Sequence, residues 1–148
     1  MVLYHASQQK DLAIIQPKRT LSRDKYIGDF IFATPHKTLA LMYLVPKGFA
    51  TLMNYDKNPP SIVICAAKDE LARRDTGGAI YELSPENFKQ SPQVELRQDE
   101  MASRQPEKPK SSEVYGSALD ALSSHGITIE FTDQAGFEKL LRKKPPAS

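Results

Sequence analysis

Short apolar runs separated by turn residues dominate this chain, and they predict more strand than helix. Seven runs are rich in Ile, Val, Leu, Phe and Tyr and are bounded by Gly, Pro, Asn or Asp, which is typical of strands. We expect these strands at Val2–His5, Phe30–Thr34, Thr51–Tyr55, Ser61–Ala66, Ala79–Leu83, Val94–Arg97 and Ile127–Phe131.

Helical patterns are fewer. Thr34 followed by Pro35 is typical of an N-cap and a first-turn proline, and predicts a helix over His36–Leu44. Gly126 predicts a left-handed C-cap for an earlier helix. Because strands dominate and helices are scattered, an α+β domain is favoured over a doubly wound α/β sheet. The other expected helices are Lys68–Arg74, a single turn at Ser84–Glu86, Val114–His125, and a last one from Thr132 or Asp133 to Leu141.

Length and composition favour one ordinary globular domain. The chain has 148 residues, of which 40% are hydrophobic and 26% charged. We expect a single domain over residues 1–141, a loop over Arg104–Ser112, and a flexible tail over residues 142–148. The chain has no apolar run of transmembrane length and no signal-peptide pattern at its start, so we expect a cytoplasmic protein without a membrane partner.

Several kinds of site are disfavoured by the residues present. The single Cys65 excludes an intramolecular disulfide and a cysteine-rich zinc site, and its apolar neighbours predict a buried position. His36 and His125 have no partners at ligand spacing, so we expect no metal. A net charge of +2 is too small to indicate nucleic-acid binding by itself. No Gly-rich phosphate-binding motif follows a strand.

The first strand carries the most informative polar pair. Side chains alternate along a strand, so His5 and Ser7 share one face. An imidazole and a hydroxyl can each donate to or accept from a sugar hydroxyl or an amide. The pair therefore predicts a polar clamp for a ribose diol or a carboxamide. A histidine that is hydrogen-bonded near a strand end for structural reasons is the open alternative.

The segment Phe32-Ala33-Thr34 also allows two interpretations. It is either a buried strand that enters a capped helix or one wall of a pocket. In the second case an aromatic ring on the following helix would stack on a planar heterocycle. Tyr43 is the candidate ring, and a core tyrosine is the alternative.

These two strands together resemble the opening of the ADP-ribosyltransferase fold. In that family an H-G-[ST]-type strand and an [FY]-A-[ST]-type strand hold the nicotinamide end of NAD. The segments Gly78–Leu83 and Glu100–Pro106 extend the resemblance over most of the chain. Glu100–Pro106 is similar to an S-x-[ED]-P-type segment of small bacterial members such as the rifampicin ADP-ribosyltransferases. The spacing of Gln98-Asp99-Glu100 resembles the acid motif of some ADP-ribosylating toxins.

The resemblance implies a fold and an activity. The fold is an ADP-ribosyltransferase-like split β-sheet with a few flanking helices, in which the strands of His5 and Phe32 are adjacent. The activity is transfer of ADP-ribose from NAD to an unknown acceptor (a protein, a nucleic acid, a small molecule or water) with release of nicotinamide. No cofactor other than NAD, as substrate, is implied.

The resemblance also implies roles for named residues. His5 and Ser7 would hold the nicotinamide ribose, Phe32 and Thr34 would line the pocket, and Tyr43 would stack, although strict register with the poly(ADP-ribose) polymerases selects Met42. Cleavage of the ribose–nicotinamide bond develops oxocarbenium charge, which a carboxylate stabilises. The catalytic residues would be Glu100 and His5, with Glu113 as the second candidate acid, just before the helix expected at Val114.

Departures from the family pattern keep other functions open. Ala6 replaces the usual glycine, and its methyl group could crowd the approach of a carboxamide to the backbone. One alternative is an inactive module of this fold that binds NAD, another nucleotide or a protein. Another is an NAD-dependent enzyme acting on a terminal phosphate of RNA, which would need more basic residues in its cleft. The basic residues Lys18, Arg19, Arg23 and Lys25 lie either in a solvated loop or over the NAD diphosphate or a polymeric substrate.

Overall fold

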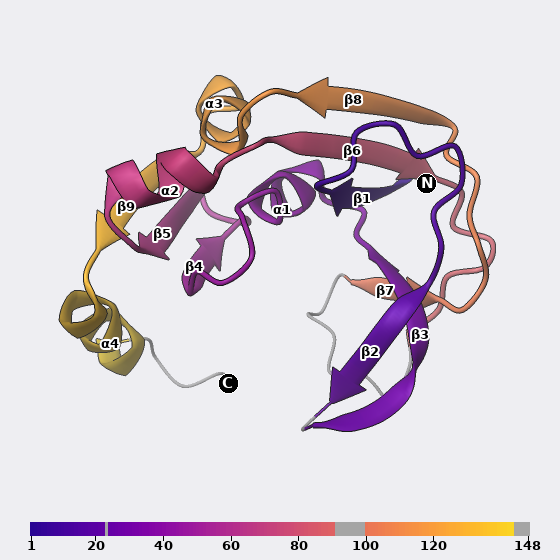
Figure 1. The fold of residues 1–148 in the computed structure, drawn as a ribbon, viewed down its shortest axis with the longest axis horizontal. Helices are drawn as coiled ribbons and strands as arrows, with labels where there is room; N and C mark the ends of the chain where they lie inside the picture. Colours follow the sequence, from indigo (N-terminus) through magenta and orange to yellow (C-terminus); the bar gives the residue numbers. More distant parts are fainter. Residues whose placement is uncertain (23, 91–99, 144–148) are drawn as a thin grey trace.

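A computed structural model describes residues 1–22, 24–90 and 100–143. The described residues form nine strands and four helices mixed along the chain, which confirms the α+β class (Figure 1). The strands are β1 (Leu3–Ser7), β2 (Lys18–Ser22), β3 (Lys25–Ala33), β4 (Thr51–Asn54), β5 (Ser61–Cys65), β6 (Gly78–Leu83), β7 (Met101–Ser103), β8 (Ser111–Tyr115) and β9 (Thr128–Thr132). The helices are α1 (Lys37–Met42), α2 (Lys68–Arg74), α3 (Ala118–Ser124) and α4 (Gln134–Lys143).

The strands of the described residues form three sheets of three strands each. The first has the order β1-β6-β8 and the second the order β2-β3-β7, and both are antiparallel throughout. The third has the order β4-β5-β9, in which β5 pairs antiparallel with β4 and parallel with β9. In Figure 1 the β2–β3 hairpin extends away from the layer that holds β1, β6 and β8.

The strands of His5 and Phe32 meet differently from the sequence-based expectation. β1 and β3 belong to different three-stranded sheets, so adjacency within one sheet is wrong. The two strands touch at one antiparallel bridge, where the Tyr4 N–H donates to the Thr34 carbonyl at 2.7 Å and the Thr34 N–H donates back at 3.0 Å. The reason is that the nine residues of β3 are paired with β2 and β7. The bridge to β1 is formed by Thr34, the residue after β3.

The buried side chains form two clusters. One packs α1 and α3 against β5, with Met42, Ile62 and Leu122 fully buried. The other lies between β1, β3 and β6 and contains Leu3 and Tyr81. Burial of these apolar surfaces is the main force that holds the elements together. The first cluster therefore fixes α1 in position, and the second fixes β1.

The expected helix over Val114–His125 is wrong in its first third. Val114 lies in β8, and α3 begins only at Ala118. Ser117 is the N-cap, since its side-chain oxygen accepts from the Asp120 N–H at 3.2 Å. Glu113 consequently lies on a strand and not at a helix start. The predicted C-cap is confirmed, because Gly126 has a φ of 75°.

The start of α1 also differs from the expectation. Helical residues begin at Lys37, and His36 occupies the N-cap position without a side-chain cap bond. Thr34 lies two residues earlier, and its hydroxyl oxygen accepts from the His36 N–H at 3.1 Å. Thr34 thus closes the turn that precedes the helix and does not cap the helix itself.

Other boundaries need correction as well. Lys18, Arg19 and Lys25 lie in β2 and β3, not in a loop, and β7 was not expected.

Further expectations were wrong. Residues 84–86 contain no helix. Cys65 is half-buried and not fully buried, with its thiol 3.5 Å from the Gln134 side-chain oxygen. Ser111 and Ser112 belong to β8, and residues 142 and 143 belong to α4 and not to a tail. The strand expected at Val94–Arg97, Arg23, and residues 144–148 of the expected tail lie outside the described residues.

Candidate functional site

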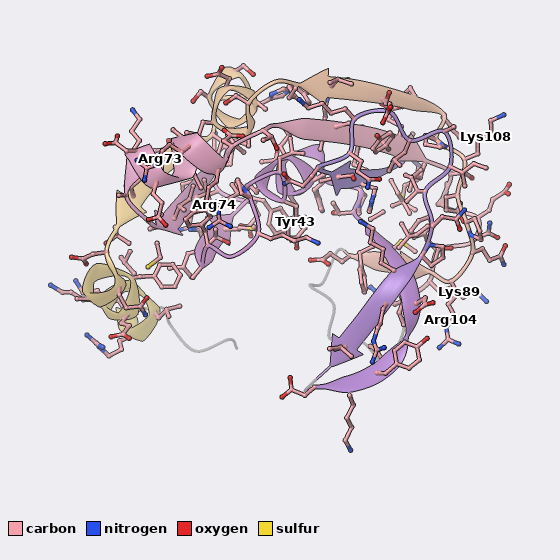
Figure 2. All side chains as sticks on the ribbon, viewed as in Figure 1. Tyr43, Arg73, Arg74, Lys89, Arg104 and Lys108 are labelled. Carbon is pink, nitrogen blue, oxygen red and sulfur yellow. The ribbon has the colours of Figure 1, made fainter. Side chains whose placement is uncertain are left out.

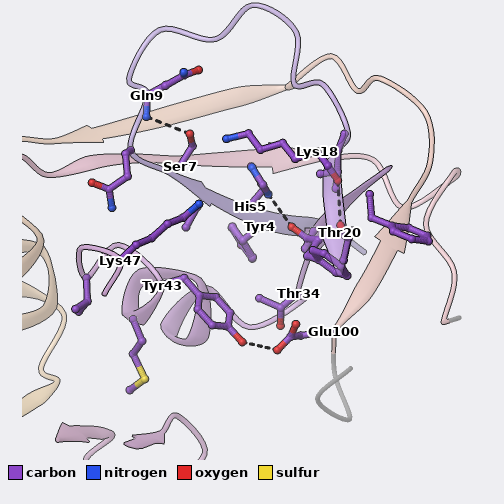
Figure 3. A pocket seen from close by; sticks show the side chains of 18 of the residues that line it. Tyr4, His5, Ser7, Gln9, Lys18, Thr20, Thr34, Tyr43, Lys47 and Glu100 are labelled. Carbon is purple, nitrogen blue, oxygen red and sulfur yellow. Dashed lines mark hydrogen bonds between the residues drawn. The ribbon is translucent and has the colours of Figure 1, made fainter. Parts of the chain in front are cut away.

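A pocket of about 770 Å³ lies where β1, the β2–β3 hairpin, α1 and the loop after α1 meet (Figure 3). Its volume is within the range that small-molecule sites occupy in proteins. The six site residues expected from the sequence all line this pocket, although they come from positions 5 to 100 of the chain. They are His5, Ser7, Phe32, Thr34, Tyr43 and Glu100.

His5 is fixed in one tautomer by the backbone of β3. Its Nδ1 lies 2.6 Å from the carbonyl oxygen of Phe32, so the Nδ1–H donates and Nε2 keeps a lone pair. Burial lowers the pKa of His5, and the nearby Lys18 lowers it further, while the bond to Phe32 opposes both effects. At neutral pH the ring is therefore uncharged, and Nε2 can accept a hydrogen bond from a ligand.

Ser7 and Thr34 already take part in local turns. The Ser7 hydroxyl oxygen accepts from the Gln9 N–H at 3.1 Å, which leaves its own O–H as a donor (Figure 3). Thr34 is 1% exposed, and its hydroxyl accepts from His36. Ser7 is thus a polar contact of the pocket, whereas Thr34 chiefly fixes the backbone between β3 and α1.

Tyr43 and Glu100 face each other across the lower part of the pocket in Figure 3. The Tyr43 hydroxyl donates to the Glu100 carboxylate, which joins the end of α1 to the segment that enters β7. Tyr43 is 39% exposed, while its neighbour Met42 is fully buried. Both side chains border the pocket, but Tyr43 presents an exposed aromatic ring there, whereas Met42 is packed into the core.

Glu113, the second candidate acid, lies elsewhere. The described residues that line the pocket do not include it. Its carboxylate accepts from the Lys37 ammonium at 2.8 Å and from the Tyr115 hydroxyl at 2.6 Å. These two bonds lower the pKa of Glu113 and hold it as a structural carboxylate on β8.

Three cations line the pocket; the sequence placed Lys18 and Arg19 over the NAD diphosphate as one of two alternatives and left Lys47 unassigned. Lys18 and Arg19 line it from β2, and Lys47 lines it from the loop after α1. Figure 3 shows Lys47 reaching from that loop toward β1. With Glu100, the described lining carries three positive charges and one negative charge, since His5 is neutral. The basic run that includes Lys18 and Arg19 indicated this wall as one of its two interpretations, whereas no sequence pattern marks Lys47.

The described residues form neither a membrane-spanning helix nor a cluster of metal-ion ligands. No described helix combines the length and the apolar character that crossing a bilayer requires. Within residues 1–22, 24–90 and 100–143, no three His, Cys, Asp or Glu side chains converge so that they could hold a metal ion.

The arrangement can bind a polar ligand with an anionic part. His5 Nε2 supplies an acceptor, Ser7 a donor, Tyr43 an aromatic surface beside a carboxylate, and the surrounding cations favour negative charge. Comparisons of the chain with protein-family models, with curated proteins and with solved structures found no match.

Proposed function

We propose that the protein transfers ADP-ribose from NAD to an acceptor and releases nicotinamide. The observation that carries this proposal is the convergence of six residues, selected for their resemblance to ADP-ribosyltransferases, on one pocket. In this proposal the small sheets correspond to the split β-sheet of that family. Its two halves would be the sheets that contain β1 and β3, which touch at the bridge between Tyr4 and Thr34.

The nicotinamide ribose would lie against His5. Since Nδ1–H is engaged by Phe32, Nε2 accepts from a ribose hydroxyl, and the Ser7 hydroxyl donates to the ribose or to the carboxamide. The ring of Tyr43 would stack on the nicotinamide, which is a planar heterocycle. Each of these contacts orients the bond that breaks.

Glu100 would stabilise the charge that develops on the ribose. The bond between ribose C1′ and the nicotinamide nitrogen breaks, its electron pair leaves with nicotinamide, and C1′ gains oxocarbenium character. A carboxylate beside C1′ lowers the energy of that state. The acceptor then bonds to C1′ and loses a proton. Tyr43 holds the Glu100 carboxylate through its hydroxyl.

The cations of the pocket support an anionic ligand such as a dinucleotide. Lys18, Arg19 and Lys47 are exposed and line the pocket on two sides. A diphosphate carries two negative charges that such side chains attract, and the attraction falls as salt rises.

A module that binds NAD without cleaving it is the second candidate. Ala6 lines the pocket beside His5 and Ser7, where the family pattern has glycine. The Cβ of Ala6, which the family's glycine lacks, would crowd a carboxamide that approaches the backbone of β1 closely. This departure opposes turnover more than it opposes the fold.

Nicotinamide release from NAD tests the proposal. Wild type, Glu100→Gln and Glu113→Gln would be incubated with NAD, with water and then a mixture of proteins and nucleic acids as acceptors, and nicotinamide would be measured by chromatography. We expect Glu100→Gln to release nicotinamide roughly 10²–10³ times more slowly than wild type, because a preorganised charge is lost. Glu113→Gln, outside the pocket, should release it at the wild-type rate.

Two outcomes would change the assignment. If Glu113→Gln abolishes release and Glu100→Gln does not, the assignment of Glu100 as the catalytic acid is wrong. If wild type binds NAD and releases no nicotinamide with any acceptor, the binding module is the correct function. Calorimetry that detects no NAD binding to wild type contradicts both.

A further inference from the structure

The loop between α1 and β4 forms the end of the pocket opposite the β2–β3 hairpin. Four of its residues, Val45, Pro46, Lys47 and Phe49, line the pocket. Phe49 is half-buried and partly packs on the core, and it is an aromatic ring of this wall with no role in the family resemblance. A pocket-facing aromatic ring is suited to stack on a planar heterocycle.

Arg74 at the end of α2 holds this loop from outside. Its Nη2 donates to the Lys47 carbonyl at 3.0 Å, and its guanidinium carbon lies 4.6 Å from the centre of the Phe49 ring. The described residues that line the pocket do not include Arg74. Arg74 therefore covers Phe49 from the side away from the pocket and fixes the ring in place. Figure 2 shows Arg74 beneath α2, on the side of Tyr43 that faces β4.

The backbone between Lys47 and Phe49 is shaped to this contact. Gly48 has a φ of 98°, a conformation that side chains with a Cβ rarely adopt. A Cβ at this position would lie 3.4 Å from Arg74 Nη2. Gly48 thus lets the loop curl around the guanidinium, which puts Lys47 and Phe49 on the pocket side together.

A cation and an aromatic ring two residues apart match the chemistry of a nucleoside phosphate. We propose that Phe49 stacks on the adenine ring of NAD, that Lys47 contacts the adjoining phosphate, and that Arg74 is a positioning residue for both. This inference rests on the proposed function and adds the recognition of the adenylate half. It makes the protein selective for the dinucleotide over its nicotinamide mononucleotide part.

The affinity for NAD, measured by calorimetry, tests the role of Phe49. We expect Phe49→Leu to weaken NAD binding about ten-fold, since stacking of a base on an aromatic ring is lost. Phe49→Tyr keeps the ring and should bind NAD as wild type does. Phe131→Leu is the matched control, because Phe131 is also half-buried against the same core cluster but does not line the pocket. Thermal unfolding of each variant separates lost binding from lost folding.

Adenosine monophosphate, used as a competitor, tests which half of NAD Phe49 recognises. We expect it to displace NAD from wild type, and we expect its own dissociation constant, obtained from the competition, to rise about ten-fold in Phe49→Leu. Equal NAD affinity in folded Phe49→Leu and wild type, or failure of adenosine monophosphate to displace bound NAD, overturns the inference and leaves the proposed function standing. Absence of NAD binding to wild type instead overturns the proposed function, and this inference with it.

Arg74 is tested by Arg74→Gln beside Arg73→Gln. Both arginines are exposed at the end of α2. Arg74 contacts the Lys47 carbonyl and the Phe49 ring, whereas no such contact of Arg73 is seen among the described residues. We expect Arg74→Gln to weaken NAD binding roughly two- to five-fold, the range of an exposed cation–π contact. Nicotinamide release at saturating NAD should keep its wild-type rate. Equal NAD affinity in the two variants removes the positioning role.

Discussion

At the scale of single residues, one backbone contact decides what His5 can do. Alternation along β1 was enough to predict that His5 and Ser7 share a face. The tautomer could not be predicted, because it depends on the Phe32 carbonyl, 27 residues away in the chain. Tyr43 is similar: the helix before it was expected, although it ends at Met42 and not at Leu44, whereas the bond from Tyr43 to Glu100 depends on how residues distant in sequence come together.

His5→Ala should weaken NAD binding about ten-fold. The change removes the Nε2 acceptor and leaves a ribose hydroxyl in the pocket without its partner, which costs about 1–3 kcal/mol of binding free energy. Calorimetry on both proteins at pH 7.5 or so measures the difference. Equal affinities would remove His5 from the site.

The protonation state of His5 predicts how NAD binding depends on pH. Burial lowers the pKa of His5 below its ordinary 6.5, so the ring is neutral and Nε2 accepts throughout the neutral and mildly alkaline range. As pH falls through the lowered pKa, Nε2 becomes protonated and loses its acceptor. NAD affinity should therefore be constant above pH 6.5 and decrease below it. An affinity that rises on acidification would contradict a neutral acceptor.

Tyr43→Phe should separate two roles of Tyr43. The ring is kept, so NAD affinity should stay near the wild-type value, whereas loss of the hydroxyl leaves Glu100 less well positioned. We expect nicotinamide release to slow about ten-fold, equivalent to one hydrogen bond to a charged group. Tyr43→Ala should lose affinity as well. Unchanged release in Tyr43→Phe would limit Tyr43 to stacking.

At the scale of elements, apolar runs bounded by turn residues were predictable, whereas the polar strand β2 and the start of α3 were not. The helix over Lys68–Arg74 and the strands near Ser61–Cys65 and Gly78–Leu83 lie where the apolar pattern predicted them. β2 was missed because its sequence, Lys-Arg-Thr-Leu-Ser, has a single apolar residue, and the strand is formed by pairing with β3. The start of α3 was missed because Val114 and Tyr115 fit a helix period, while the Ser117 cap competes with it.

Asp75 is the clearest structural link between elements. Its carboxylate accepts from the N–H groups of Gly77, Ala118 and Leu119 and from the Ser117 hydroxyl, at 2.7–3.0 Å, and so connects the end of α2 with the start of α3. Burial alone would raise the pKa of Asp75, but these bonds together outweigh burial and lower it.

Asp75→Asn should destabilise the fold by about 2 kcal/mol at pH 7, because it replaces a carboxylate that accepts several hydrogen bonds at a helix N-terminus. Since the folded-state pKa is lowered from 3.8, the contribution is present above pH 4 or so and is lost as pH falls through the folded-state value. Denaturant unfolding at several pH values measures it. Asp56→Asn, in an exposed turn, is the control; an equal effect of both changes would remove Asp75 as a link.

At the scale of the whole molecule, the pocket exists because separate parts of the chain enclose it. Figure 1 shows the β2–β3 hairpin on one side and α1, β4 and their loop on the other, with β1 between them. The sequence predicted the α+β class and the six lining residues. It could not predict that β3 would leave the first sheet, since the pairing partners of a strand are set by tertiary contacts.

Hydrogen exchange should show both walls responding to NAD. Binding stabilises the residues that the ligand contacts, so amide exchange should slow in β2 and in residues 45–49, which lie on opposite sides of the pocket. Residues of β8 and α3, which do not line it, should exchange at unchanged rates in comparison with the NAD-free protein. Protection confined to β8 and α3 would place the ligand elsewhere.

A crystal structure of the wild-type protein with an NAD analogue whose glycosidic bond cannot break is the most direct measurement. We expect the analogue in the pocket, with a ribose hydroxyl within hydrogen-bond distance of His5 Nε2 and the Glu100 carboxylate beside C1′. An analogue bound outside this pocket, or bound with its nicotinamide ribose away from both His5 and Glu100, would contradict the proposed function.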